Sequence, residues 1–227
     1  MFDNFIHIDH NNTLSNNPWG SVIQHYRFDE KNIQILIPDS KLIHQYYLQQ
    51  IPTEGNNFYW ARLWPASIAL CRFIADNTNL IQGKKVAEIA AGLGLPSLLS
   101  AHYAKHVYTS DYCAHAVSLM EQSVALNGLT NIQCNVMDWH IIPKYFTPDV
   151  LLLSDINYDP NEFIVLQQLI NDFIQKGILI ILCTPQRLVA KAFIEPLLYY
   201  CIKKENYNIE INNTCTETTV FVFFKQF

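Results

Sequence analysis

The chain has 227 residues, of which 50% are hydrophobic and 15% are charged, so it can bury one sizeable core and has no reason to stay unfolded. Its longest purely apolar runs, such as 178–183, fall far short of the ~18 residues of a membrane helix, so we expect no membrane span. The 15 basic and 20 acidic residues are scattered, which argues against a nucleic-acid-binding surface. The first 26 residues contain no Lys or Arg and do not resemble a secretory signal, so we expect a cytoplasmic protein.

The cysteines and the closely spaced histidines predict no metal site. None of the 6 cysteines forms a C-x-x-C pair, so free and mostly buried thiols are expected. Two histidine pairs have a spacing that could hold a metal, but each lacks a third ligand nearby: His7 with His10, and His102 with His106.

An N-terminal extension is expected over residues 1–57. It comprises strands at 23–28 and 33–37 around a turn at 29–32, a helix capped by Asp39 or Ser40 that runs to 49, and a polar loop at 52–57. Pro38 separates the second strand from the helix. We expect this hairpin and helix to lie over the active-site side of a single domain that covers 1–227.

The core, residues 58–227, alternates short apolar strands with helices. In chain order the predicted elements are a helix at 66–77, a strand at 86–89, a helix at 95–105, a strand at 106–110, a helix at 113–127, strands at 132–136 and 150–154, a helix at 161–175, a strand at 178–183, and strands at 207–211 and 218–224. This alternation predicts right-handed βαβ crossovers and a parallel sheet covered on both faces. The last two strands form a hairpin, so we expect an antiparallel strand at the end of the sheet.

Ligands of such sheets bind where the strands end, so the residues just after each strand carry the functional information. The first predicted strand is followed by a loop with Gly92 and Gly94, where the backbone can approach a ligand closely, and by Pro96 at the start of a helix. This x-G-x-G spacing differs from the G-x-G-x-x-G of dinucleotide-binding proteins, which makes an NAD-dependent oxidoreductase improbable.

Three further strand ends are polar. Asp111 could accept hydrogen bonds from ribose hydroxyls, or it could only cap the following helix. After the third strand, the Asp138 carboxylate could accept an adenine amino hydrogen and the Trp139 indole could cover the ring. The fourth strand ends in Ser154-Asp155-Ile156-Asn157-Tyr158.

Together these stretches resemble the class I S-adenosylmethionine-dependent methyltransferases, and within them the seven-beta-strand protein-lysine methyltransferases. The resemblance rests on 86–97, on Asp111, on 136–139 and on the D-x-x-Y motif of Asp155 to Tyr158, and it covers about 60–170. It implies an α/β Rossmann-like fold with a seven-stranded sheet, and S-adenosyl-L-methionine as cofactor. The implied cofactor-binding residues are Trp64, Glu88, Ala90, Gly92, Gly94, Asp111, Asp138, Trp139 and Ser154.

The resemblance implies catalytic roles for Asp155 and Tyr158 and has two departures. Asp155 would orient the acceptor amine, and Tyr158 would shape its channel. Ala90 stands where the family usually has glycine, which could weaken cofactor affinity, and Leu93 replaces a hydroxyl residue. We expect the pairing of Glu88 with the cofactor's amino group to persist.

A protein lysine is the expected methyl acceptor, and the acidic excess suits a basic protein partner. A small amine or other metabolite is the alternative acceptor within the same chemistry. A cofactor-binding sensor or assembly factor with little turnover is the alternative from another class, with Ala90 as its best sequence indication. All three interpretations stay open on the sequence alone.

Overall fold

The computed structural model describes residues 7–9, 19–50 and 58–225, and leaves the side chains of 7–9, Gln50 and Val189 undescribed. Its main feature is a seven-stranded sheet in the order β6-β5-β4-β7-β8-β10-β9. The strands are β4 Lys85–Glu88, β5 His106–Asp111, β6 Ile132–Val136, β7 Val150–Ser154, β8 Leu179–Pro185, β9 Cys201–Ile211 and β10 Thr214–Phe223. The first five are parallel to one another, which confirms the predicted α/β sheet.

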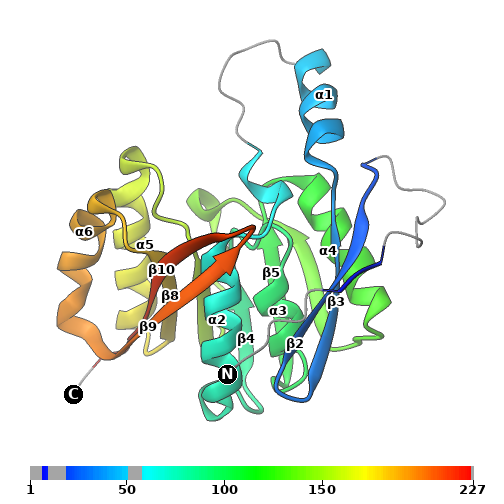
Figure 1. Cartoon of the computed structure of the whole chain (residues 1–227). Helices are drawn as coiled ribbons and strands as arrows, with labels where there is room; N and C mark the ends of the chain where they lie inside the picture. The colour runs from blue at the N-terminus through cyan, green and yellow to red at the C-terminus, as the bar shows by residue number, and fades with distance from the viewer. Residues whose placement is uncertain (1–6, 10–18, 51–57, 226–227) are drawn as a thin grey trace.

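Helices cover both faces of this sheet (Figure 1). They are α2 Pro65–Asp76, α3 Leu95–Ser100, α4 Ala114–Leu126, α5 Phe163–Gln175 and α6 Leu188–Ile194. Alternate residues of β7 point to opposite faces: Val150 and Leu152 pack in the core with α2, α3 and α4, whereas Leu151 and Leu153 pack with α5 and α6. All four are fully buried, which explains why this strand reads as a continuous apolar run.

The N-terminal extension contains the predicted hairpin and helix. Strands β2 Val22–Phe28 and β3 Lys31–Ile37 are joined by a two-residue turn, β1 His7–Asp9 pairs with β2, and helix α1 Ser40–Gln50 follows. The Asp39 carboxylate accepts the Lys41 backbone N–H at 2.7 Å, as an N-terminal cap should. The predicted loop at 52–57 lies outside the described residues.

The hairpin does not lie over the active-site side, contrary to expectation. It packs against α3 and α4, where the Leu36 N–H donates to Ser123 Oγ at 3.1 Å and the Gln34 N–H donates to Asn127 Oδ1 at 2.9 Å. Buried apolar residues on β3, including Ile33 and Leu36, join the same core as α2 and α3. Of the helices and strands described in the extension, α1 stands at the end of the molecule where the parallel strands end (Figure 1).

Other differences from the predicted elements have local causes. Helix α3 ends at Ser100. Beyond it, the Asn131 side-chain amide donates hydrogen bonds to the carbonyl oxygens of Ala101 and Ala104 at 2.9 and 3.1 Å. The terminal hairpin turns at Asn212 and Asn213, both with positive φ, so its strands are longer than predicted. Helix α6 and the 3₁₀ segment Glu195–Tyr200 were not predicted.

The antiparallel strand is β10, as expected from a C-terminal hairpin, but it is not at the edge of the sheet. It inserts between β8 and β9, and β9 forms the edge. Within the described ranges, no helix has the length and apolar character to cross a membrane.

Candidate active site

A cavity lies at the carboxyl ends of β4, β5, β7 and β8, where the sequence places the ligand-binding residues. Most of the predicted site residues line it: Trp64, Ala90, Gly92, Asp111, Trp139, Ser154, Asp155 and Tyr158. Glu88, Gly94 and Asp138 do not. The structure thus brings together residues that are far apart in the sequence, from 64 to 158.

The loop after β4 presents its backbone to this cavity. Ala90 and Gly92 both adopt left-handed conformations, with φ of 53° and 57°. A Cβ at Gly92 would lie 3.3 Å from the Trp60 carbonyl oxygen, so a side chain there would crowd the neighbouring segment. Ala90 carries a methyl group in a conformation that favours glycine, which is a strained arrangement for an L residue. The loop is therefore shaped for close approach of a ligand.

Asp111 links the two strand ends that border this loop. One carboxylate oxygen accepts the Gly92 N–H and the other accepts the Cys113 N–H, both at 2.9 Å. Burial raises the pKa of Asp111, and these backbone hydrogen bonds oppose that rise. An ionised carboxylate has about four acceptor positions, so beside the backbone groups of Gly92, Cys113 and Tyr112 it can still accept a hydroxyl donor from a ligand in the cavity. Asp111 is thus both a loop-bracing cap and a wall of the site.

Glu88 lies beneath the loop and does not line the cavity. Its side chain is fully buried, and one oxygen accepts hydrogen bonds from the backbone N–H and the hydroxyl of Ser97 at the start of α3. The other oxygen is buried without a partner among the described residues. Burial raises the pKa of Glu88 to about 8. These contacts support the loop from below, whereas the expected pairing with a cofactor amino group stays a prediction.

Gly94 also has a packing role. Its φ is 75°, and an added Cβ would lie 2.8 Å from the Met120 Sδ on α4. It caps the N-terminus of α3. Gly94 therefore lets the loop turn tightly into α3 and pack against α4. It does not itself line the cavity.

Asp138 and Trp139 border a second, adjoining cavity, which shares Ala90, Tyr112, Trp139 and Tyr158 with the first. The Asp138 carboxylate accepts the His140 backbone N–H at 2.9 Å and pairs with the His140 ring at 2.7 Å, and these contacts lower its pKa. The opposite ring nitrogen of His140 lies 2.9 Å from Glu162. The two cavities thus meet at the Trp139 indole.

Asp155 sits at the end of β7 with a φ of 52°, another left-handed non-glycine residue. The residue is 7% exposed, and its carboxylate receives two parallel hydrogen bonds from the Arg187 guanidinium, both at 3.0 Å. Burial raises the pKa of Asp155 to about 6, although the Arg187 charge works against that rise. Arg187 follows β8 and lines the same cavity.

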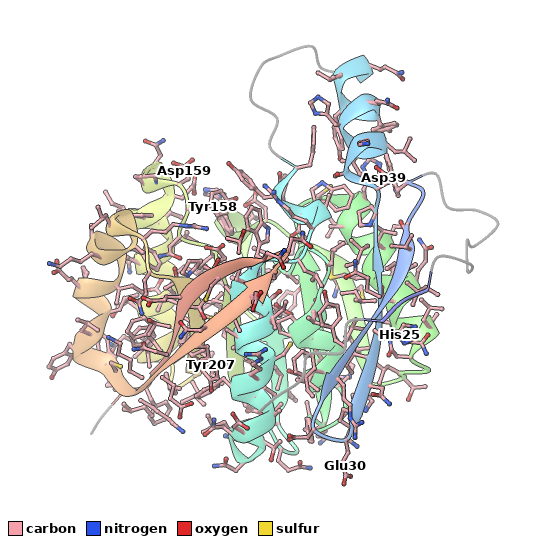
Figure 2. All side chains as sticks on the ribbon, in the orientation of Figure 1. His25, Glu30, Asp39, Tyr158, Asp159 and Tyr207 are labelled. Atoms are coloured by element: carbon pink, nitrogen blue, oxygen red, sulfur yellow. The ribbon has the colours of Figure 1, made fainter. Side chains whose placement is uncertain are left out.

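Tyr158 belongs to an aromatic group at the mouth of the cavity. Its ring centroid lies 4.8 Å from that of Tyr59, which in turn lies 5.9 Å from Trp64. The Arg62 guanidinium stacks 4.0 Å from the Trp64 ring. Burial raises the pKa of Tyr158 to about 12, so its hydroxyl stays protonated at neutral pH. Figure 2 shows Tyr158 at the same end of the molecule as α1.

Sequence reasoning missed Arg187 and Tyr112 and favoured a core position over a substrate-channel role for Tyr59, whereas all three line the cavity. Arg187 could have been found, because it follows the fifth parallel strand and the rule of strand ends applies there as well. Tyr59 and Tyr112 carry no such signal, since aromatic residues before helices are usually part of a core. No group of three or more potential metal ligands occurs in the part of the chain that the structure describes.

Comparison with curated proteins finds methyltransferases. The rat histone-arginine methyltransferase METTL23 is 31% identical over 111 residues, which cover 46% of this chain and 49% of that protein. The Chaetomium thermophilum protein-lysine N-methyltransferase EFM3 is 28% identical over 144 residues, covering 56% of this chain and 42% of that protein. The chain thus spans about half the length of the curated relatives it matches.

Solved structures share the fold at low identity. The Thermus thermophilus 16S rRNA N2 G1207 methyltransferase RsmC, in complex with AdoMet and guanosine, aligns with a TM-score of 0.61 at 14% identity, covering 90% of this chain and 50% of that one. A Pyrococcus horikoshii protein described as a putative RNA methyltransferase aligns with a TM-score of 0.58 at 15% identity, covering 83% and 98%.

The profile of one protein family, described as lysine methyltransferase, matches residues 45–198. That range includes every site residue named above, from Tyr59 to Arg187. Because the match extends over well more than half of the sequence, and the sheet and its cavity agree with it, this chain belongs to the lysine methyltransferase family.

Proposed function

We propose that the chain is an S-adenosyl-L-methionine-dependent methyltransferase that transfers a methyl group to an amine of a protein, most simply a lysine ε-amine. The observation that carries this proposal is the placement of two carboxylates, Asp111 and Asp155, on the walls of one cavity at the ends of β5 and β7. The first suits the ribose of a nucleoside cofactor, and the second suits the N–H of an amine acceptor. Family membership supports the same chemistry.

The cavity walls fit the cofactor. The left-handed loop at Ala90 and Gly92 brings backbone to the cavity surface, and a Cβ at Gly92 would close part of that space. The Asp111 carboxylate would accept a ribose hydroxyl, and the Trp139 indole would cover the adenine. When bound, the cofactor supplies an electrophilic methyl carbon on a sulfonium, which a neutral amine attacks as the carbon–sulfur bond breaks and its electron pair stays on sulfur.

The protein's own contribution at the acceptor end is to bind, orient and keep water out. A lysine amine has an unperturbed pKa of about 10.4 and must lose a proton before it can act as a nucleophile. Asp155 would hold one N–H of the amine, so that the nitrogen lone pair points at the methyl group. The rings of Tyr59, Trp64 and Tyr158 would exclude water, and the Tyr158 hydroxyl, protonated at neutral pH, could accept a further hydrogen bond.

The whole chain acts as one methyltransferase domain in this proposal, with residues 58–227 as the cofactor-binding core and residues 1–57 as its extension. The shared hydrophobic core of β3, α3 and α4 supports one domain. Helix α1, which stands beside the strand ends, would border the path of an incoming protein (Figure 1).

The test uses the protein with tritium-labelled S-adenosylmethionine in a cell lysate, with and without prior protease treatment of the lysate. Label in a discrete protein band that protease removes supports the proposal. Label in a small-molecule fraction would instead indicate a metabolite amine as acceptor. Titration calorimetry with S-adenosylhomocysteine and with NAD gives an independent check, and tighter binding of NAD would contradict the cofactor assignment.

A further inference from the structure

The Asp155 carboxylate is already engaged by a cation of this chain. Arg187 donates through both terminal nitrogens, one to each carboxylate oxygen, and both distances are 3.0 Å. Asp155 is 6% exposed in its side chain and Arg187 is 39% exposed, so the pair sits at the boundary between the interior and the cavity. This two-point arrangement is the geometry in which a guanidinium recognises a carboxylate most specifically.

The Asp155 carboxylate keeps some of its hydrogen-bond acceptor positions free for the methyl acceptor. An ionised carboxylate offers about four acceptor positions, two on each oxygen. The Arg187 fork takes the two that face the same way, one from each oxygen. The remaining two point outward in different directions, so a planar guanidinium cannot reach both with a parallel pair of N–H groups. A single N–H of an amine can reach one of them.

We propose that Arg187 is a positioning and specificity-determining residue, which fixes the Asp155 carboxylate and closes its two-point face, so that the acceptor is an amine rather than a guanidinium. This inference rests on the proposed methyl transfer and adds the class of acceptor. It decides between the two kinds of chemistry named among the relatives, because one set is called arginine and another lysine methyltransferases.

The charges around the pair favour a neutral amine. Arg187 cancels the charge of Asp155, so an ammonium group next to Asp155 also meets a nearby cation and is less stabilised than beside a lone carboxylate. The other titratable or charged groups that face Asp155 or share its cavity come from four elements and loops: Tyr59, Arg62, Asp111, Tyr112, Tyr158 and, below it, Cys183. Arg62 is stacked on Trp64, so it does not compete for the carboxylate.

Arg187 also keeps Asp155 ionised. Burial alone pushes the pKa of this carboxyl upward, and Arg187 is the group that opposes it. An opposite charge at this distance lowers a carboxyl pKa, so removal of Arg187 would raise the pKa of Asp155 further. A protonated Asp155 would lose the negative charge with which it orients the N–H of the acceptor amine.

The first experiment identifies the methylated atom. Protein labelled in lysate with tritiated S-adenosylmethionine is hydrolysed in acid, and N-methyl-lysine is separated from N-methyl-arginine. Label in methyl-lysine is expected. Label in methyl-arginine would overturn this inference while leaving the methyltransferase function standing, whereas no label in any protein, despite cofactor binding, would overturn both.

The second experiment compares Arg187→Met, Arg187→Lys and the control Lys191→Met, which removes an exposed cation on α6, the helix that begins just after Arg187. Arg187→Met should lower kcat/KM for the labelled protein band by about tenfold or more at pH 7 and move the acidic limb of its pH profile upward. Arg187→Lys should restore part of the rate, and Lys191→Met should change neither quantity. Unchanged rate and pH profile in a folded Arg187→Met protein would refute the assignment.

A third experiment does not depend on catalytic activity, so it still reports on Arg187 if a variant loses activity for another reason. The side-chain carboxyl carbon of Asp155 is followed by NMR as a function of pH in the wild type, in Arg187→Met and in Lys191→Met. The Asp155 titration should move to higher pH only in Arg187→Met. Identical titration in all three proteins would show that Arg187 does not act through Asp155.

Discussion

Two non-glycine residues of the site, Ala90 and Asp155, hold left-handed backbone conformations. Such conformations cost L residues free energy and persist where the surrounding structure fixes them, often at functional positions. Asp155 is fixed by its backbone N–H bond to the Cys183 carbonyl at 2.8 Å and by the Arg187 fork. Ala90 has no comparable side-chain anchor, because its side chain is a methyl group. A substitution to glycine should therefore relieve the backbone strain at Ala90.

Ala90→Gly should strengthen cofactor binding and leave stability unchanged or slightly higher. Relief of the left-handed strain gains about 1–2 kcal/mol, and the added freedom of glycine in the unfolded chain costs about 0.4–1 kcal/mol. Removal of the methyl group also opens the cavity wall. Titration calorimetry with S-adenosylhomocysteine and thermal melting measure the two effects, and weaker binding by the variant would contradict the expected crowding.

Asp111→Ala should lower both cofactor affinity and stability, because the carboxylate braces Gly92 and Cys113 and also faces the cavity. Lost hydrogen bonds to a charged acceptor are worth ~1.5–3 kcal/mol each. The matched control is Asp39→Ala, which removes a helix cap of α1 away from the cavity and should cost ~0.5–2 kcal/mol of stability alone. Equal Kd values for wild type and Asp111→Ala would remove Asp111 from the binding site.

Glu88 should make stability fall as pH rises. Its pKa is raised to about 8 in the folded protein, above the ordinary value of 4.5, so ionisation disfavours the folded state. The stabilisation is fully present below pH 4.5 and is lost progressively up to about pH 8. Glu88→Gln should flatten this part of the profile. Chemical unfolding at several pH values measures it, and parallel profiles for the two proteins would contradict the assignment.

At the scale of elements, the strands of the parallel sheet were the most predictable. β7 and β8 are apolar over most of their length because both faces are covered, and such runs are visible in sequence. β9 was recognised only in its second half. Its first half contains Lys203, Lys204 and Glu205, which suit the solvent at the edge of a sheet and hide the strand from an apolar pattern.

Substitution of Gly94 measures how tightly the loop after β4 packs against α4. Gly94→Ala should destabilise the protein by more than Gly83→Ala. Both glycines have positive φ, but only at Gly94 would a Cβ meet a neighbour, the Met120 Sδ at 2.8 Å. The difference between the two free energies of unfolding reports the packing cost, of about 1–3 kcal/mol.

Met120→Ala combined with Gly94→Ala provides the control for this contact, because the smaller side chain leaves room for the new methyl group. The double variant should lose less stability than the sum of the single changes, as for residues in contact. Simple additivity would mean that strain, not the Met120 contact, explains the effect of Gly94→Ala.

At the scale of the whole molecule, the extension and the core should unfold together. The hairpin shares a core with α3 and α4 and gives two backbone N–H groups to side chains of α4 or its end, Ser123 and Asn127. Hydrogen exchange should therefore give the amides of β3 and β5 the same opening free energy. Removal of residues 1–57 should leave a core that aggregates or melts at a lower temperature. A deletion protein with wild-type Tm would separate the two parts.

The location of the site could be predicted from the sequence, but its charge balance could not. Parallel strands must end at one side of the sheet, so Asp111 and Asp155 were expected to lie near each other. The engagement of Asp155 by Arg187 depends on side-chain directions across 32 residues of chain, which no local pattern encodes. The raised pKa of Glu88 depends likewise on its burial beneath α3, and the presence of an acidic residue in the sequence does not indicate burial.

The order of the sheet has a consequence for the behaviour of the protein at high concentration. Because β10 inserts between β8 and β9, the strongly apolar strands lie inside the sheet and the charged strand β9 closes one border. Unpaired strand borders are templates for association between molecules, and lysine side chains there discourage it. The turn at Asn212 and Asn213 thus makes the charged strand β9 the edge of the sheet. Its charged side chains oppose pairing between the edge strands of two copies of the protein.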